Sequence, residues 1–189
     1  MSTFRRGFKS WCESTAIQFR TVLALPPTSP LPTRKLAEHL GLRVLDVHKV
    51  PGLPHKALDQ LTRKDPDEWS AVMVMHRGVI IVVMNTTHSP GRQASSLAHE
   101  CSHVILKHKP AQALQSPGGI LVSSYDRQQE DEADWLAGAL LLPRVALVKI
   151  SYDGIDYNRH AHEYGVSEDM LRMRLDRTGV HLQMRRRAS

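Results

Sequence analysis

Two histidines and a glutamate lie within five residues of one another, in the order His99, Glu100 and His103. Residues four apart on an α-helix differ by about 40° in direction and lie one turn apart, so both imidazoles can reach the same ion. Glu100 lies beside that face, where its carboxylate can reach a water molecule on the ion without binding the ion itself. The spacing is therefore typical of a divalent-metal site with its own general base.

An alternative is that the two histidines are unrelated, one buried in a helix and the other exposed. The flanking residues favour the metal site, because Leu97, Ala98 and residues 104–106 make the helix apolar enough to be buried. Buried imidazole and carboxylate groups are costly unless a partner satisfies them, and a divalent cation does so. Cys101 points about 200° away from His99, so we expect it to be a small core residue and not a ligand.

A catalytic zinc site needs a third protein ligand, and a second helix expected over residues 128–142 offers several carboxylates. Glu130 and Asp134 are four residues apart and share a face. One of them can bind the metal while the other accepts the spare N–H of a zinc histidine. Glu132 lies about 200° from Glu130 and is expected to face solvent. The acidic cluster could instead complement the positive end of the helix dipole, and Asp131 is assigned to that role.

The elements that must position these residues follow from hydrophobic periodicity and from glycine and proline breaks. Helices are expected over about residues 8–23, 34–40, 93–109 and 128–142, with Thr33 as the N-cap of the second. Strands are expected over residues 42–47, 71–75 and 79–84, the last two joined as a hairpin. Loops are expected at residues 50–54, 85–91 and 111–124, and residues 145–189 are expected to be helical and irregular.

Composition places the chain among ordinary globular proteins. Its 189 residues are 41% hydrophobic and 23% charged, with a net charge of +6. This excludes a disordered or low-complexity chain, and no apolar run approaches the roughly 18 residues that span a bilayer. Two cysteines cannot form a disulfide framework, and the N-terminus has no apolar core of a secretory signal, so we expect a cytoplasmic protein.

The two helical stretches resemble the ImmA/IrrE family of zinc metallo-endopeptidases. Residues 97–103 hold the histidine motif, and residues 130–143 are similar to the family pattern E-x-x-A-[ND]-x-F-A-x-x-L-L-x-P. Further similarity is found at residues 34–41, at the hairpin ending in Asn85, and at residues 164–167 with Leu171 and residues 174–175. The resemblance covers about residues 30–180. Three residues depart from the family: Ser102 replaces a glycine, Leu136 replaces a phenylalanine, and His108 follows His103 by five positions, not four.

The resemblance implies that His99, His103 and Glu130 bind one Zn²⁺ ion and that Glu100 is catalytic. Asp134 is then the expected partner for the spare N–H of a zinc histidine. The family's substrates are transcriptional repressors with helix-turn-helix domains, so the resemblance implies a cytoplasmic endopeptidase that relieves repression of mobile elements or stress genes. The alternative is a non-catalytic DNA- or protein-binding regulator on the same zincin-like fold.

A helix-turn-helix pattern occupies residues 157–177, with a glycine turn at Gly165 and Ser167 as the N-cap of its second helix. That second helix carries charges of both signs: Arg172, Arg174, Arg177, Asp169 and Asp176. Direct DNA binding is one interpretation, although the aspartates reduce the positive charge of the face. We favour a packing element that completes the peptidase or docks the substrate repressor.

We therefore expect an α+β, zincin-like fold, with a small twisted sheet and the histidine-bearing helix packed on the glutamate-bearing helix. Three parts are expected: an N-terminal helix and proline-rich linker (1–30), a metallopeptidase domain (31–145), and a helical segment with a basic tail (146–189). Residues 79–84 are expected as an edge strand that could hold an extended substrate, with an ordinary core strand as the alternative. Tyr125, His88 and Arg127 are candidates for stabilising the oxyanion.

Overall fold

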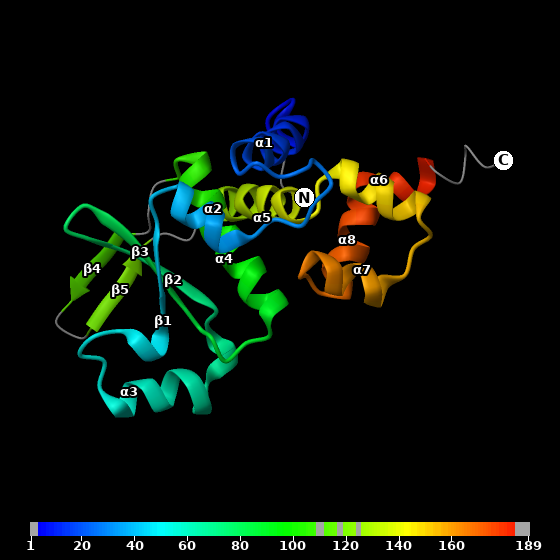
Figure 1. Ribbon diagram of the computed structural model, residues 1–189. Coiled ribbons are helices and arrows are strands. Elements are labelled where there is room, and N and C mark those ends of the chain that lie inside the picture. The colour runs from blue at the N-terminus through cyan, green and yellow to red at the C-terminus, as the bar shows by residue number, and fades with distance from the viewer. Residues whose placement is uncertain (1–3, 109–111, 117–118, 124–125, 184–189) are drawn as a thin grey trace.

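The computed structural model describes the backbone of residues 4–108, 112–116, 119–123 and 126–183, and the side chains of residues 4–108 and 126–183. A three-stranded sheet and α3 lie at one end of the molecule, and α6, α7 and α8 lie at the other (Figure 1). Helices α1, α2, α4 and α5 lie between them. The expected basic tail and Tyr125 fall outside the described residues.

The helices and strands expected from hydrophobic periodicity occur in the expected order, and further elements lie between them. The main helices are α1 (Phe8–Val22), α2 (Thr33–His39), α3 (His55–Asp59), α4 (Pro90–Leu106), α5 (Arg127–Leu141), α6 (Arg144–Tyr152), α7 (Tyr157–Tyr164) and α8 (Glu168–Thr178). The short ones are η1 (Val47–Lys49), η2 (Gln60–Lys64) and η3 (Pro66–Glu68). The strands are β1 (Arg43–Asp46), β2 (Ala71–His76), β3 (Val79–Met84), β4 (Gln112–Ser116) and β5 (Gly119–Ser123).

Two expectations about these elements are wrong. The segment expected as a loop at residues 111–124 contains β4 and β5, which pair antiparallel as a separate two-stranded sheet. Thr33 is not the N-cap of α2, because Pro32 occupies that position and no side chain caps the helix. The proposed boundaries at residues 30 and 145 stay a prediction.

The larger sheet has the strand order β1-β3-β2, with β1 parallel and β2 antiparallel to the central strand. The tight connection between β2 and β3 has positive φ angles at Arg77 (49°) and Gly78 (79°), as a two-residue hairpin turn requires. Residues 79–84 are therefore the central strand, which corrects the expectation of an edge strand. The edges of this sheet are β1 and β2, and β2 runs beside α4.

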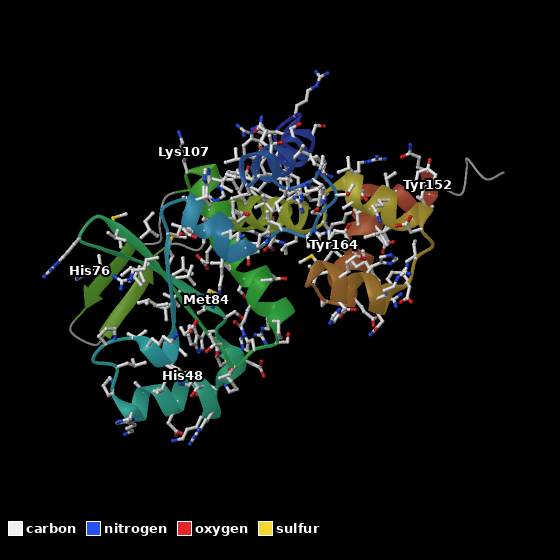
Figure 2. All side chains as sticks on the ribbon, viewed as in Figure 1. His48, His76, Met84, Lys107, Tyr152 and Tyr164 are labelled. Atoms are coloured by element: carbon white, nitrogen blue, oxygen red, sulfur yellow. The ribbon has the colours of Figure 1, made fainter. Side chains whose placement is uncertain are left out.

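Two apolar clusters meet at α5. The first joins the sheet, α1, α2 and α4 to one side of α5, through residues such as Val82, Leu97 and Leu136. The second joins α6, α7 and α8 to another side of α5, through residues such as Leu141 and Leu171. Figure 2 shows His76, at the tip of the hairpin, and Tyr152, at the end of α6, at opposite ends of the molecule. Because α5 is packed on several sides, the carboxylates near its start are held on a rigid support.

Two buried arginines and a half-buried glutamate, here termed the arginine cluster (Glu13, Arg20 and Arg174), close the C-terminal end of α5. Arg174 is 1% exposed and donates hydrogen bonds to the Leu142 carbonyl at 3.0 and 3.2 Å and to Glu13 Oε1 at 2.7 Å. Arg20 is fully buried and donates to the Leu141 carbonyl at 3.5 Å. The last carbonyls of α5, which lack partners within the helix, are therefore satisfied by side chains from α1 and α8.

Candidate metal centre

Helix α4 starts at a well-defined cap and carries both histidines on one side. Ser89 is the N-cap and accepts a hydrogen bond from the Arg92 N–H, while Pro90 occupies the first turn, where proline is favoured. One side of the helix is buried in the core: Leu97, Ala98, Cys101 and Ser102. Another side carries His99 and His103, whose Nε2 atoms lie 2.9 Å apart.

Helix α5 brings a carboxylate to the two histidines. Its N-cap Asp126 accepts hydrogen bonds from the backbone N–H groups of residues 128 and 129, which fixes the start of the helix. Glu130 Oε2 lies 3.1 Å from His99 Nε2, and Glu130 Oε1 lies 3.6 Å from His103 Nε2. Within the described part of the chain, these three side chains form a group that could hold a metal ion, with ligand atoms within 4.8 Å of one another.

The three distances fit a tetrahedral divalent cation. Zinc bonds to nitrogen and oxygen ligands are about 2.0–2.1 Å long, which separates two ligands of a tetrahedron by about 3.3 Å. The observed separations of 2.9, 3.1 and 3.6 Å lie on both sides of that value. Two imidazole nitrogens and one carboxylate oxygen also form the donor set of catalytic zinc sites, in which a fourth position is left for water.

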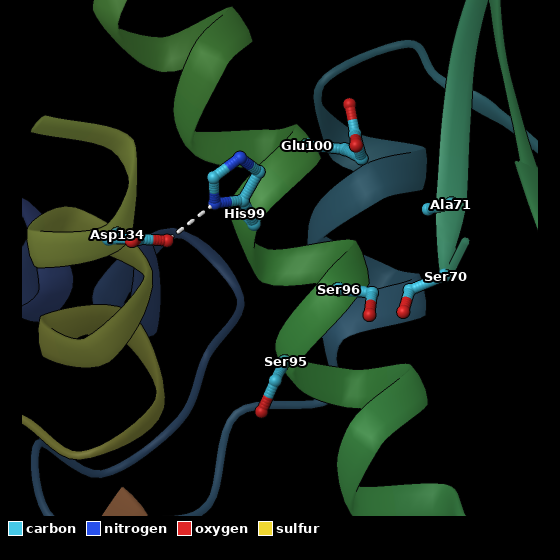
Figure 3. A pocket seen from close by; sticks show the side chains of 7 residues that line it. All are labelled: Ser70, Ala71, Ser95, Ser96, His99, Glu100 and Asp134. Atoms are coloured by element: carbon cyan, nitrogen blue, oxygen red, sulfur yellow. Dashed lines mark hydrogen bonds and ion pairs between the residues drawn. The ribbon is translucent and has the colours of Figure 1, made fainter. Parts of the chain in front are cut away.

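Asp134 lies one turn after Glu130 and reaches the other nitrogen of His99. The His99 Nδ1–H donates to Asp134 Oδ1 at 2.9 Å, and Figure 3 shows this contact between α4 and α5. This is the contact that the four-residue spacing of the two carboxylates predicts. An imidazole held in this way presents its Nε2 lone pair toward the ion, and the carboxylate makes it a more basic ligand.

His108 and Glu132 lie behind His103, and sequence reasoning did not place either in the site. His103 Nδ1 lies 3.0 Å from His108 Nδ1, and His108 Nε2 lies 3.4 Å from Glu132 Oε2. The expectation that Glu132 faces solvent is wrong, because its side chain is only 15% exposed and contacts His108. Two features of the sequence could have indicated this pair. One is a third histidine shortly after the motif, and the other is that the acidic residues of the next helix occupy more than one of its sides.

The surroundings move the pKa values of the two histidines in opposite directions. Burial lowers the pKa of His99, but its hydrogen bond to Asp134 and the neighbouring carboxylates outweigh burial and raise it above the usual value. Burial, together with His99 and His108, lowers the pKa of His103 to about 4. His103 is therefore neutral at pH 7, as a metal ligand must be.

Glu100 lies on the side of α4 that faces β2, next to an open pocket (Figure 3). The pocket is lined by Ser70, Ala71, Ser95, Ser96, His99, Glu100 and Asp134. Burial raises the pKa of Glu100, and the charge of Glu130 raises it further against the opposing effect of His99. A carboxyl group whose pKa is raised toward neutrality is suited both to accept and to release a proton.

Of the oxyanion candidates that the structure describes, neither His88 nor Arg127 lines the pocket. The side chain of His88 is almost buried, with Nε2 2.8 Å from the Pro66 carbonyl oxygen. Arg127 is exposed at the start of α5 and is not among the residues that line the pocket. Cys101 is fully buried, as expected for a core residue, and burial raises the pKa of its thiol to about 12.

The expected order of helix, glycine turn and helix is present in the C-terminal part. Gly165 has a φ of 63° after α7, and Ser167 Oγ accepts a hydrogen bond from the Met170 N–H at the start of α8. Arg174, however, is buried in the arginine cluster and cannot contact DNA. Arg172 is half exposed, but its guanidinium lies 3.7 Å from the centre of the Tyr157 ring. Arg172 and Arg174 therefore both make contacts within the molecule, so α8 presents less positive charge to solvent than its sequence indicates.

No helix in the described ranges is long and apolar enough to cross a membrane. A comparison with curated proteins found no match. The family model of the IrrE N-terminal-like domain, a peptidase family, matches residues 52–176, about two thirds of the chain. The matched region contains α4, α5 and all the residues of the candidate metal centre, on the α+β zincin-like fold that the resemblance implies. The chain therefore belongs to the ImmA/IrrE family of metallopeptidases.

Proposed function

We propose that this chain is a zinc-dependent endopeptidase. His99, His103 and Glu130 would hold the ion, and Glu100 would be the general base. The observation that carries the proposal is the convergence of three ligand atoms within 4.8 Å of one another, beside a carboxylate that lines an open pocket. Membership of a metallopeptidase family supports the same function.

The chemistry follows from the ligands and the base. A zinc ion in this site would supply a Lewis acid that lowers the pKa of water to about 7 and polarises a peptide carbonyl. Glu100 accepts a proton from the attacking water on its carboxylate oxygen and delivers it to the nitrogen of the leaving amine. A carbon–oxygen bond forms, the carbon–nitrogen bond of the peptide breaks, and the carboxylate of Glu100 is regenerated.

The substrate would bind along the edge of β2. This strand pairs with β3 on one side, and no second strand pairs with it among the described residues. Ser70 and Ala71, at the start of β2, line the same pocket as Glu100. An extended peptide can add to an open strand through backbone hydrogen bonds, which would place its carbonyl groups beside the general base. The edge strand β2 thus takes the role that sequence reasoning gave to residues 79–84.

The proposed substrate is a helix-turn-helix transcriptional repressor in the cytoplasm, whose cleavage relieves repression. The family resemblance supports this substrate class, since ImmA/IrrE peptidases act on such regulators. In this proposal α7 and α8 complete the packing of the peptidase and contribute a surface on which the repressor docks. A repressor gene next to the gene for this chain would supply the substrate for the test.

The decisive experiment is the substitution Glu100→Gln, which keeps the three metal ligands and removes the base. We expect the rate of repressor cleavage to fall by about 10²–10⁴-fold, while the zinc content of the purified protein stays the same. Glu38→Gln is the matched control, because Glu38 is exposed on α2, outside the candidate metal centre and outside the helices proposed to dock the repressor. Undiminished cleavage by the Glu100→Gln variant would falsify the proposed mechanism. An unchanged zinc content in a His99→Ala variant would reject the ligand set.

A further inference from the structure

The Nδ1 atoms of the two proposed zinc histidines have different partners. His99 Nδ1 contacts the carboxylate of Asp134 directly at 2.9 Å. His103 Nδ1 instead lies 3.0 Å from the Nδ1 of His108, which in turn contacts Glu132 through its Nε2 at 3.4 Å. Each histidine therefore has a carboxylate behind it, but behind His103 a second imidazole lies between the two groups.

A turn at the end of α4 places His108 against His103. The helix ends at Leu106, and Lys107 adopts the left-handed conformation with a φ of 56°. The His108 N–H then donates to the His103 carbonyl at 3.0 Å, and the two rings lie 5.0 Å apart at 70°. A left-handed conformation is unfavourable for a residue with a side chain, so the rest of the structure must hold this turn in place.

The order of the contacts determines which nitrogen of His103 carries the proton. An ionised Glu132 only accepts hydrogen bonds, so the Nε2–H of His108 must donate to it. The Nδ1 of a neutral His108 is then an acceptor and receives the Nδ1–H of His103. His103 is thereby left with its lone pair on Nε2, the atom that lies 3.6 Å from Glu130 and 2.9 Å from His99 Nε2.

The contact between His108 and Glu132 differs from a surface contact because both side chains are largely buried. The side chains of His108 and Glu132 are 8% and 15% exposed, so water competes weakly for their hydrogen bonds. By contrast, Asp134 is 67% exposed. The pair behind His103 is thus the more enclosed of the two.

We propose that His108 and Glu132 are positioning residues, which hold His103 in the tautomer and ring orientation that metal binding requires. The inference rests on the metal binding of the proposed function and adds two residues to that site. Neither side chain would touch the metal or the substrate. Loss of such an outer partner typically weakens metal affinity by about 10–100-fold.

The test measures the Kd for Zn²⁺ of the full chain, by competition with a chelating dye, and the visible absorption bands of its Co²⁺ form. His108→Leu removes the acceptor of the His103 N–H and should raise the Kd by about 10–100-fold. His108→Asn keeps an acceptor near the position of Nδ1 and should restore most of the affinity. Glu132→Gln should weaken binding, because an amide can either donate or accept and no longer selects one tautomer.

The matched control is Asp131→Asn, which removes the same charge from the adjacent, half-buried position of α5 and should leave the Kd within about twofold, since the contacts of His103 and His108 described above run to Glu132 and not to Asp131. Glu132→Gln should have no further effect in the His108→Asn background, because Asn lacks the second nitrogen that contacts Glu132. This double substitution decides the question even if His108→Leu fails to fold.

The possible outcomes separate this inference from the proposed function. An unsubstituted chain that binds no Zn²⁺ overturns both. A chain that binds Zn²⁺ with the same Kd and the same Co²⁺ spectrum in every variant overturns the role of His108 and Glu132 alone. Equal effects of Glu132→Gln with and without His108→Asn would mean that Glu132 acts by charge and not through His108, which also overturns the proposal.

Discussion

Helix α5 has a polar cluster near each end, and the two clusters are satisfied in different ways. Near its start, Glu130 meets two imidazoles whose facing atoms are all potential metal ligands. At its end, the arginine cluster supplies N–H donors to the carbonyls of Leu141 and Leu142. In the arginine cluster the protein itself supplies donors for the carbonyl acceptors. In the candidate metal centre a bound cation would be shared by the ligand atoms.

The two clusters also differ in how far their side chains are exposed to solvent. Arg20 and Arg174 are 0% and 1% exposed, with Glu13 half-buried beside them. The side chains of His99 and Glu130 are 24% and 31% exposed, and His99 lines the open pocket. A polar group that is closed and internally satisfied contributes to folding, and one that is open and presents several potential metal ligands is available for binding. The comparison therefore predicts that substitutions in the arginine cluster mainly lower the free energy of unfolding. Substitutions in the candidate metal centre should mainly lower metal affinity and activity.

The largest effect on stability is expected from Arg174→Ala. This substitution leaves the Leu142 carbonyl without its donor and Glu13 without its charge partner, so the free energy of unfolding should fall by about 3 kcal/mol. Urea denaturation measures the change. Arg172→Ala on the same helix is the control and should cost about 1 kcal/mol or less, because Arg172 is half exposed.

The Kd for Zn²⁺ of the Arg174→Ala variant should equal that of the unsubstituted chain. A large loss of metal affinity would show that the two clusters are coupled through α5, and the comparison would then be wrong.

Addition of Zn²⁺ should have the next largest effect. At a concentration 100 times the Kd, an ion that binds only the folded chain raises the free energy of unfolding by about 2.7 kcal/mol. The same increment is expected for the Arg174→Ala variant, measured by urea denaturation with and without the ion. Glu130→Gln should lose most of the increment, because it removes a charged ligand. A full increment in that variant would exclude Glu130 from the ligand set.

The smallest effect is expected from Gly138→Ala in the middle of α5. A Cβ atom at this position would lie 2.9 Å from Cδ of Arg174, which is held in place by its hydrogen bonds. Overpacking costs about 1–3 kcal/mol, and alanine regains about 1 kcal/mol of helix propensity, so a net loss of about 1 kcal/mol should be found by thermal or urea unfolding.

The double substitution sharpens this last prediction. Once Arg174 is replaced by alanine, the clash is gone and Gly138→Ala should no longer destabilise the chain. If the cost of Gly138→Ala were the same in both backgrounds, its origin would lie elsewhere in α5.

The part of the site that follows from helical spacing could be predicted from the sequence. His99 and His103 share a helix side because they are four residues apart, and the same holds for Glu130 and Asp134. Their meeting needs only that α4 and α5 pack together, which their apolar sides favour. Periodicity on one helix and a carboxylate at the matching spacing on the next are local properties, and local properties are visible in a sequence.

The rest depends on features that no local pattern determines. His108 reaches His103 because Lys107 adopts a left-handed conformation, which sequence rules expect of glycine. Glu132 is enclosed because α5 has neighbours on several sides, whereas a helix with one buried side would expose it. The central place of β3 depends on its parallel pairing with β1, which lies more than thirty residues earlier in the chain. Arg174 and Arg172 differ by two positions in sequence, and only the tertiary packing distinguishes their roles.

The edge of β2 that no strand covers among the described residues would limit what the proposed peptidase could cut. A strand edge accepts a backbone only when that backbone is stretched out and has its own amide groups unoccupied. The interior of a stably folded partner meets neither condition. Under the proposed function, scission would therefore be confined to interdomain linkers and frayed chain ends, and the folding state of the target would be as much a determinant of selectivity as its amino-acid sequence.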